Sequence, residues 1–251
     1  MTWASKRQTA IILVLFVLAT IPILFIVYKI NTIPPTCSDK KQNQSEVGVD
    51  CGGPCVLLCK SQVSDLVVSW KRFFLVGDGV YNVVVYVENP NTGAGARDVG
   101  YQIRVLNKDD ISMYERHGVT TIPAKRSVPI IETGLSLGSQ VPVRIEFKFD
   151  DGIVWTKQDI KEIPLVASNN SFTNSTSSTR LITNIVNKDF NSYSNIEIVA
   201  ILYDEAGNAV GASRTFMDNI GGNQTIPITF TWPIPFKAVP AKIEVIPKVF
   251  I

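Results

Sequence analysis

One uncharged apolar run near the N-terminus constrains this chain more than any other feature. It extends from Ala10 to Tyr28, 19 residues interrupted only mildly by Thr20 and Pro22. A helix needs about 20 such residues to cross about 30 Å of hydrocarbon, whereas the apolar region of a cleavable signal is about 7 to 15 residues long. A buried helix of a soluble domain is the alternative, but no later segment has a helical pattern that would cover it. We therefore expect a transmembrane signal anchor over residues 10–30, after a stub over residues 1–9.

The charges that flank this run indicate an orientation. Lys6 and Arg7 precede the run together with the amino terminus, and only Lys29 follows it closely. An excess of basic residues favours the cytoplasmic side of a membrane span. We expect a single-pass protein of the plasma membrane, with a cytoplasmic N-terminus and extracytoplasmic C-terminal domains.

The rest of the chain has the pattern of half-buried strands. Val143, Ile145, Phe147 and Phe149 alternate with charged residues, and the same alternation runs over 99–105. This period of two is typical of antiparallel sheets with one face on a core. The whole chain has 24 basic and 22 acidic residues, so it lacks the strongly basic face of a nucleic-acid binder.

All four cysteines lie in one short segment, which we expect to form a Cys-rich stalk over residues 31–60. In an exported chain, clustered thiols favour two disulfides, with three possible pairings. Four thiolates would also suffice for a tetrahedral structural zinc site, which is the alternative. The cysteines are Cys37, Cys51, Cys55 and Cys59.

The same segment carries oxygen ligands of the type that a hard cation prefers. Asp39, Asn43, Glu46 and Asp50 are candidate calcium ligands, although their spacing is unlike that of an EF-hand. The alternative is that these side chains are solvated residues near turns. Calcium is the one cofactor that the sequence suggests.

The segment resembles the "C-x-D-G-x-x-N-G-x-E-x-x-V-D-C-G-G-x-C" sequence that recurs in exported, multi-module bacterial surface proteins. Lys40 and Gln44 stand where that sequence has glycine. The resemblance implies a surface protein of a bacterial envelope. The positions that match are Cys37, Asp39, Asn43, Glu46, Val49, Asp50, Cys51, Gly52, Gly53 and Cys55.

The remainder divides into two similar halves. In residues 168–179, 11 of 12 residues are Ser, Thr or Asn, a composition typical of linkers. We therefore expect a linker over 167–178 between domains over 61–166 and 179–251. Superposing the halves at an offset of about 98 brings Asn89 over Asn187 and residues 99–106 over 196–203. Short alternating strands separated by regular turns predict an all-β fold with two tandem immunoglobulin-like β-sandwiches.

Each half also resembles an extracytoplasmic sandwich family. The first half, with the sequence VVVYVENPN, is similar to the type-2 late-embryogenesis-abundant or water-stress (WHy) domain. The second half, with AILYDEAG, is similar to the FxLYD domain and has Ala200 at the position of the phenylalanine. The resemblance implies non-enzymatic binding or spacer modules.

Catalytic motifs are incomplete. Ser136 lies in a G-x-S-x-G sequence, but that nucleophile motif requires a later histidine, and the single histidine, His117, comes earlier. We therefore expect no catalytic residues and no enzyme activity. Three tryptophans, Trp70, Trp155 and Trp232, are predicted core or inter-sheet residues, with sugar stacking as the alternative.

The sequence therefore predicts a membrane-anchored, non-enzymatic interaction or structural protein of the cell envelope. Its expected partners are the membrane and an envelope protein, with no nucleic acid and no small-molecule substrate. The alternative is a calcium-dependent adhesion or glycan-binding module.

Overall fold

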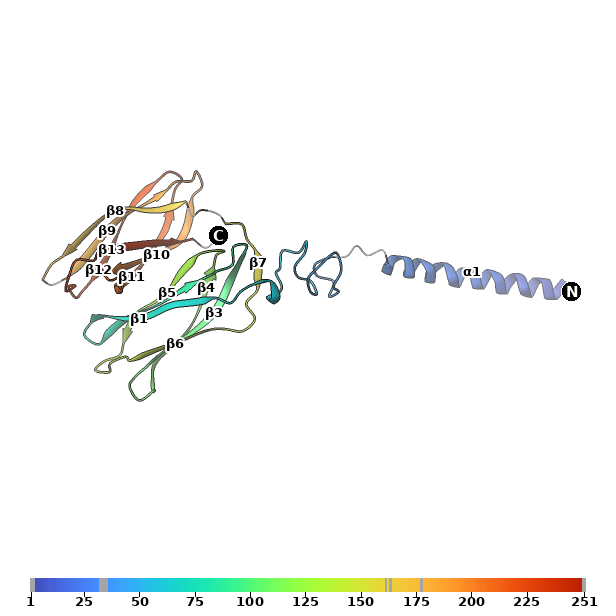
Figure 1. Ribbon diagram of the computed structural model, residues 1–251. Coiled ribbons are helices and arrows are strands. Elements are labelled where there is room, and N and C mark those ends of the chain that lie inside the picture. The colour runs from blue at the N-terminus through green and yellow to red at the C-terminus, as the bar shows by residue number, and fades with distance from the viewer. Residues whose placement is uncertain (1–2, 32–35, 161, 163, 177, 250–251) are drawn as a thin grey trace. The chain divides into compact units, whose positions relative to one another are not determined.

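The computed structural model describes residues 3–31, 36–160, 162, 164–176 and 178–249. The chain forms two compact units, one that extends to Cys55 and one that begins at Val56 (Figure 1). The first contains one helix and a disulfide-bonded loop, and the second contains all the named strands. The predicted all-β fold with a single N-terminal helix is confirmed.

Helix α1 (Trp3–Asn31) contains the predicted apolar run. Its 23 residues from Arg7 to Lys29 are long and apolar enough to cross a membrane, and none of the most apolar stretch is buried by protein. The helix begins at Trp3, so most of the stub predicted over residues 1–9 is helical; residues 1–2 lie outside the described residues. A run of apolar side chains on every face has no protein surface to cover it, as expected of an anchor or a signal sequence.

The first sandwich consists of two antiparallel sheets. One sheet has the strand order β1-β2-β5, and the other has β4-β3-β6, with β7 also paired to β3. A short 3₁₀ helix, η1 (Lys60–Gln62), precedes these strands. Their bounds are β1 (Val67–Gly77), β2 (Val80–Glu88), β3 (Ala94–Leu106), β4 (Ser112–Ile122), β5 (Ser127–Ser136), β6 (Arg144–Phe149) and β7 (Trp155–Lys157).

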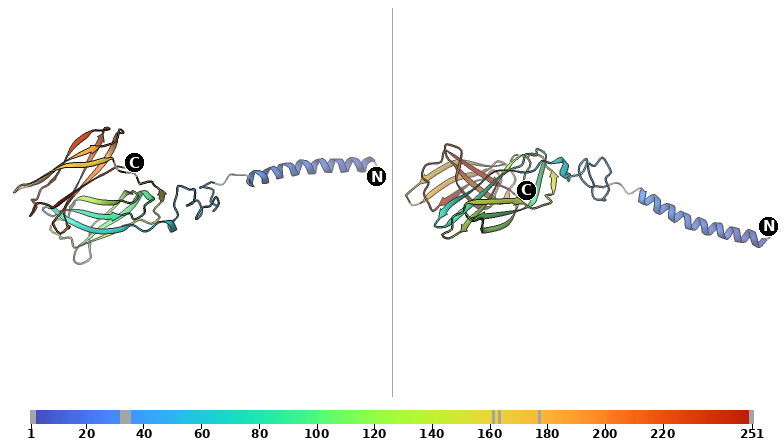
Figure 2. Two further views of the ribbon diagram at one scale, coloured as in Figure 1. Left: turned by 45° about the horizontal axis from the view of Figure 1, so that its top comes forward. Right: turned by 60° about the horizontal axis from the view of Figure 1, so that its bottom comes forward.

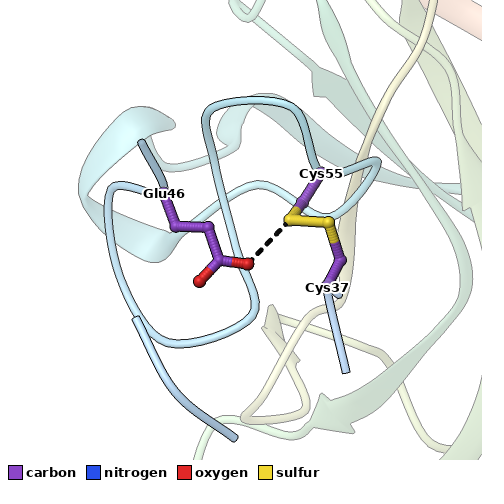
Figure 3. A group of neighbouring side chains, drawn as sticks. All are labelled: Cys37, Glu46 and Cys55. Atoms are coloured by element: carbon purple, nitrogen blue, oxygen red, sulfur yellow. Dashed lines mark hydrogen bonds between the residues drawn. A yellow bond between two sulfur atoms is a disulfide. The ribbon is translucent and has the colours of Figure 1, made fainter. Parts of the chain in front are cut away.

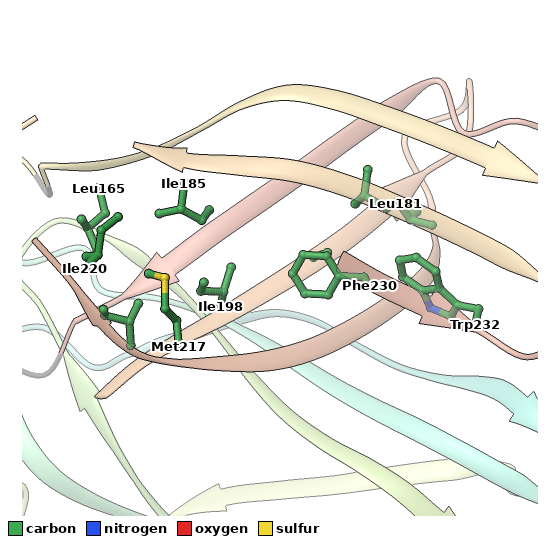
Figure 4. Close-up of a cluster of buried hydrophobic side chains, with 11 residues drawn as sticks. Leu165, Leu181, Ile185, Ile198, Met217, Ile220, Phe230 and Trp232 are labelled. Atoms are coloured by element: carbon green, nitrogen blue, oxygen red, sulfur yellow. The ribbon is translucent and has the colours of Figure 1, made fainter. Parts of the chain in front are cut away.

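The second sandwich repeats the three-strand order of both sheets. Its sheets have the orders β8-β9-β12 and β11-β10-β13, so each pairs strands that correspond to those of the first sandwich. Figure 2 shows the sheets from two further directions. The core of the second sandwich lies between the two sheets and contains Leu181, Ile198 and Phe230 (Figure 4). The bounds are β8 (Leu165–Asn174), β9 (Thr179–Asn187), β10 (Tyr193–Tyr203), β11 (Ala209–Ile220), β12 (Thr225–Trp232) and β13 (Lys242–Lys248).

The predicted internal repeat is confirmed strand by strand. Val67 begins β1 and Leu165, 98 positions later, begins β8; Ser127 and Thr225 begin β5 and β12 at the same separation. Asn89 and Asn187, which the sequence superposes, follow or end equivalent strands and make equivalent hydrogen bonds. The inward residues of β3 also have counterparts in β10, 97 positions later: Tyr101, Ile103 and Val105 match Ile198, Ala200 and Leu202.

The predicted linker over 167–178 is wrong for the residues that the structure describes. Residues 165–174 form β8, which pairs with β9 through a turn at 175–178, with Ser177 outside the described residues. The second domain therefore begins at Leu165 and not at 179. Ser, Thr and Asn predominate here because this strand lies at the edge of a solvent-facing sheet, not because the chain is a linker.

The predicted stalk also ends earlier than expected. The N–H group of Leu58 donates to the carbonyl of Trp155 at 2.9 Å, and that of Lys157 donates to Val56 at 2.8 Å. Residues 56–60 therefore belong to the sandwich unit. Residues 32–35 of the predicted stalk lie outside the described part of the chain.

The two sandwiches pack against each other through one sheet of each. A cluster of buried side chains joins β1-β2-β5 to β11-β10-β13 and is supported by Trp70, Tyr86, Tyr203 and Ile246 at its margin. Because of this contact, Val83–Val85 and Ile196–Leu202 are buried on both faces of their strands. We call this contact the inter-sandwich interface; its buried residues are Phe74, Val84, Ile131, Val199, Ile201, Ala209 and Ala212.

The outermost sheet faces are polar. On the β4-β3-β6 sheet, Arg104 binds Glu146 at 2.9 Å and lies 3.5 Å from Glu115. On β12, every second residue is exposed, and these are Thr225, Pro227, Thr229 and Thr231. The stack of repeats thus ends in polar faces, as terminal repeats do when no further copy packs on them.

Candidate functional site

The disulfide loop is the first feature that could carry function. Cys37 is bonded to Cys55, with Cα atoms 5.6 Å apart, and Cys51 and Cys59 are also disulfide-bonded. The prediction of disulfides is confirmed. Sulfurs committed to disulfides are not the thiolates that the zinc alternative requires.

The predicted calcium ligands are engaged in hydrogen bonds with the loop itself. Both carboxylate oxygens of Asp50 accept from the N–H of Lys40, at 3.1 and 3.0 Å. Asp39 accepts from Lys41 N at 2.9 Å and from Asn43 Nδ2 at 2.8 Å. The bond from the Asn43 side chain holds the pKa of Asp39 below its usual value. Short acidic side chains that accept from nearby N–H groups are typical of tight turns.

These acidic groups do not converge on one point. Within the part of the chain that the structure describes, the one close group of three metal-ligating side chains is Cys37, Glu46 and Cys55, whose ligand atoms lie within 4.8 Å of one another (Figure 3). Asp39 and Asp50 are not members of it. In two of its three members the sulfurs are bonded to each other, which leaves a single carboxylate as a ligand.

The loop requires left-handed backbone at several positions. Lys40 has φ 60° and Gln44 has φ 48°, the two positions where the similar surface-protein segment has glycine. Gly53 has φ 54°, and a Cβ there would clash with the carbonyl oxygen of Ser45. Glycine adopts this conformation without the steric cost that a side chain adds. The side chains of Lys40 and Gln44 therefore carry a steric cost that glycine at these positions would not.

Glycine in place of Lys40 or Gln44 should stabilise the loop. The left-handed conformation costs a side-chain residue about 1–2 kcal/mol, and glycine loses about 0.5–1 kcal/mol in additional chain entropy. We expect Lys40→Gly and Gln44→Gly each to slow hydrogen exchange of the loop amides by about two- to fivefold. Lys41→Gly is the matched control, because Lys41 is not among the residues with positive φ. Faster exchange in Lys40→Gly than in Lys41→Gly would contradict this account.

Side chains of each sandwich donate hydrogen bonds across the inter-sandwich interface to the other sandwich. Arg72 Nη1 donates to the carbonyl of Ala209 at 2.9 Å, and Asn82 Nδ2 donates to that of Ala212 at 3.0 Å. In the opposite direction, Arg214 Nη1 donates to the carbonyl of Ile131 at 3.0 Å. Buried backbone carbonyls at the edges of the apolar cluster are thereby satisfied. The two sandwiches are held in one register and not merely in hydrophobic contact.

Two tyrosines share one carboxylate at this interface. Tyr86 and Tyr203 donate to the two oxygens of Glu244, at 3.2 and 2.7 Å, and Trp70 stacks on Tyr86 with ring centroids 5.1 Å apart. Burial, reinforced by the charge of Glu244, raises the pKa of Tyr86 to about 12 and raises the pKa of Tyr203 as well. Both phenols are therefore neutral donors at physiological pH.

Ser136 and His117, which were considered for catalysis, lie on different strands. Ser136 is the exposed last residue of β5, and His117 is an exposed residue of β4 that lies 3.4 Å from Glu115. Among the described residues, no hydrogen bond joins Ser136 to His117. Trp155 and Trp232 are only 4% and 2% exposed and Trp70 packs at the interface, so all three occupy the predicted core or inter-sheet positions.

The first sandwich also carries a groove. Its volume is about 840 Å³, and it is lined by Arg97, Asp98, Val119, Asp150 and Val154, among others. It lies where β3 exchanges its partner β6 for β7. Its lining mixes charges of both signs with exposed valines, which does not select one class of ligand.

Comparisons with known proteins give no family. No family model and no curated protein matches the chain. Two similar solved structures are the transglutaminase of red sea bream and a β-glucuronidase of glycoside hydrolase family 2. The first is 11% identical over 75% of this chain and 29% of that chain, with TM-score 0.27. The second is 12% identical over 64% and 21%, with TM-score 0.24. The chain spans less than a third of either structure, and similarity at this level supports no argument about activity.

Sequence reasoning missed the residues that join the sandwiches. The available signal was the run VVVYV in β2, which is continuously apolar and not alternating. Such runs are typical of strands buried on both faces. The polar partners Arg72, Asn82 and Arg214 gave no signal, because their acceptors are backbone carbonyls far along the chain.

Proposed function

We propose that this chain is a membrane-anchored, extracytoplasmic and non-enzymatic structural or interaction protein of the cell envelope. The observation that carries the proposal is the exposed apolar helix α1, which precedes a body built of disulfide-bonded loop and β-sandwiches. Disulfides persist in oxidising compartments, which supports an extracytoplasmic body. The resemblances to bacterial surface segments and to WHy and FxLYD domains support the same assignment.

The orientation can be tested by labelling intact cells. We expect a membrane-impermeant amine reagent to modify the exposed Lys108 in intact cells and to reach Lys6 only after permeabilisation, because the basic flank of the span favours the cytoplasm. The measurement is the modification of each lysine by peptide mass spectrometry in the membrane fraction. Labelling of Lys6 with protection of Lys108 would indicate the opposite orientation. Recovery of the body in the soluble fraction would contradict the proposed membrane anchor.

As a mechanism, the two sandwiches would act as one stiff body and not as two flexibly linked modules. The inter-sandwich interface and its hydrogen bonds replace the flexible linker that composition predicts. A body of this kind would hold its outer surfaces at a fixed geometry with respect to each other. Both a spacer and a binding protein would use this property.

The open edge of β4 is the proposed contact for a partner. β4 lies at the end of its sheet, and its residues 118–122, which follow the charged residues Glu115 and Arg116, contain neither a proline nor a charge. Proline and charge protect sheet edges from pairing, and an unprotected edge can accept an extended segment of another protein. The side chain of Val119 near the end of this strand is 64% exposed.

Partner capture tests this role. We expect crosslinking in membranes, followed by purification from detergent, to recover a protein with the full chain but not with a control that lacks both sandwiches. Val119→Lys, which adds a protective charge to the edge, should reduce the recovery several-fold. Val154→Lys is the matched control, since Val154 is 60% exposed but lies outside β4. Recovery by neither protein would favour a passive spacer.

The calcium-dependent alternative has weaker support. The carboxylates of Asp39 and Asp50 already accept N–H groups of the loop, and these bonds account for their positions without a cation. The structural or interaction role therefore has the stronger support.

A further inference from the structure

A buried carboxylate lies against the disulfide of the loop. Glu46 is only 6% exposed, and its Oε1 lies 3.0 Å from Sγ of Cys55, which is 1% exposed (Figure 3). A sulfur in a disulfide carries no hydrogen, so it donates none to this oxygen. The contact therefore does not offset the cost of burying a charged group.

The loop holds this carboxylate in place through its other oxygen. Oε2 of Glu46 accepts from Asn43 N at 3.2 Å and from Asp50 N at 3.3 Å. These two N–H groups fix the direction of the side chain, which leaves Oε1 directed at the sulfur. The direction of the Glu46 side chain is thus set by two N–H groups of the loop backbone.

The placement matters for thiol–disulfide exchange. In that reaction an attacking thiolate forms a bond to one sulfur, the S–S bond breaks, and its electron pair leaves on the other sulfur, which then takes up a proton. Cys37 is the more exposed of the two cysteines, so attack at Cys37 would make Cys55 the leaving thiolate. Attack at Cys55 would instead bring the incoming thiolate toward Glu46. On either route, negative charge develops beside a carboxylate.

We infer that the carboxylate of Glu46 protects the Cys37–Cys55 disulfide against reduction by thiols. Like charges a few ångströms apart in a partly buried site disfavour each other, so a thiolate at Cys55 is a poorer leaving group than one in water. The disulfide is thereby kept closed electrostatically as well as by burial. This inference does not depend on where the protein is anchored or on whether it binds a partner.

The test measures reduction of each disulfide in the full chain, solubilised in detergent. The chain is incubated with excess glutathione at constant pH, the free thiols are alkylated at intervals, and peptide mass spectrometry follows each cysteine. Glu46→Gln keeps an oxygen for the two N–H groups but removes the charge. We expect it to release Cys37 and Cys55 about tenfold faster, while Cys51 and Cys59, which are also disulfide-bonded, keep their rate.

A second variant separates charge from loosening of the loop. Asp50→Asn weakens the bonds to Lys40 N but leaves the Glu46 carboxylate in place, and we expect its rate to remain within about twofold of the wild type. An unchanged rate in Glu46→Gln would overturn the inference. So would equal acceleration in Asp50→Asn, or acceleration of Cys51 and Cys59 in Glu46→Gln, because either would assign the effect to loop opening.

Discussion

Replacing Val84 with Asp is expected to unfold both sandwiches in a single, strongly destabilised transition. Val84 is completely buried in the inter-sandwich interface, where it belongs to the same cluster as Val199 and Ile201 of the second sandwich. A carboxylate there has no partner and loses its hydration, which costs about 4 kcal/mol or more. For a body of this size the midpoint should fall by about 8–16 °C, as measured by circular dichroism of the full chain in detergent.

The internal repeat supplies a matched control for this substitution. Ile182 lies 98 positions after Val84 on the equivalent strand, β9, but faces outward and is 37% exposed. Ile182→Asp should change the free energy of unfolding by about 0.5 kcal/mol or less. Equal effects of the two substitutions would show that the two sandwiches do not depend on their shared interface.

Replacing either of the two repeat-related asparagines with Ala is also expected to lower the stability of the fold strongly. Asn89 Nδ2 donates to the carbonyls of Ala94 and Pro123, both at 2.8 Å, and its Oδ1 accepts from Asn91 N at 3.0 Å. Asn89 is 1% exposed. Asn89→Ala therefore leaves the carbonyls of Ala94 and Pro123 and the N–H of Asn91 without this partner, at a cost of about 3 kcal/mol.

The second repeat should respond in the same way. Asn187 Nδ2 donates to the carbonyls of Asn191 and Gly221, at 2.7 and 2.9 Å, and its Oδ1 accepts from Asp189 N. Asn187→Ala should lower the thermal midpoint by about 6–12 °C, as Asn89→Ala does. Asn170→Ala, at an exposed position of β8, is the control and should have little effect. A small change in either core variant would mean that water replaces the amide.

Asn89 and Asn187 have the same structural role in the two sandwiches. In each repeat one amide joins the connection that follows its strand to the turn that leads into the partner strand. The side chain thereby closes one end of each sandwich. The Asn-Pro-Asn turn that resembles the WHy domain is one instance of this arrangement, and residues 187–189 are the other.

The features that depend on local patterns are predictable from the amino-acid sequence alone. The apolar run over 10–28 predicts one helix, the alternation over 99–105 and 143–149 predicts strands, and the clustered cysteines predict disulfides. The offset of about 98 residues predicts the duplicated sandwich. Each of these follows from helical rise, strand periodicity or covalent chemistry, which neighbouring residues specify on their own.

How these parts are assembled depends on contacts between segments far apart in the sequence. The Ser-, Thr- and Asn-rich segment has the composition of a linker, yet it forms β8 because β9 offers a ladder and the outer sheet face requires polar side chains. Glu46 has the sequence character of a calcium ligand, yet the fold of the loop turns it toward the Cys55 sulfur. The inter-sandwich interface joins residues more than 100 positions apart. Such contacts depend on which faces meet in space; the apolar run in β2 indicates burial on both faces but does not specify the partner face.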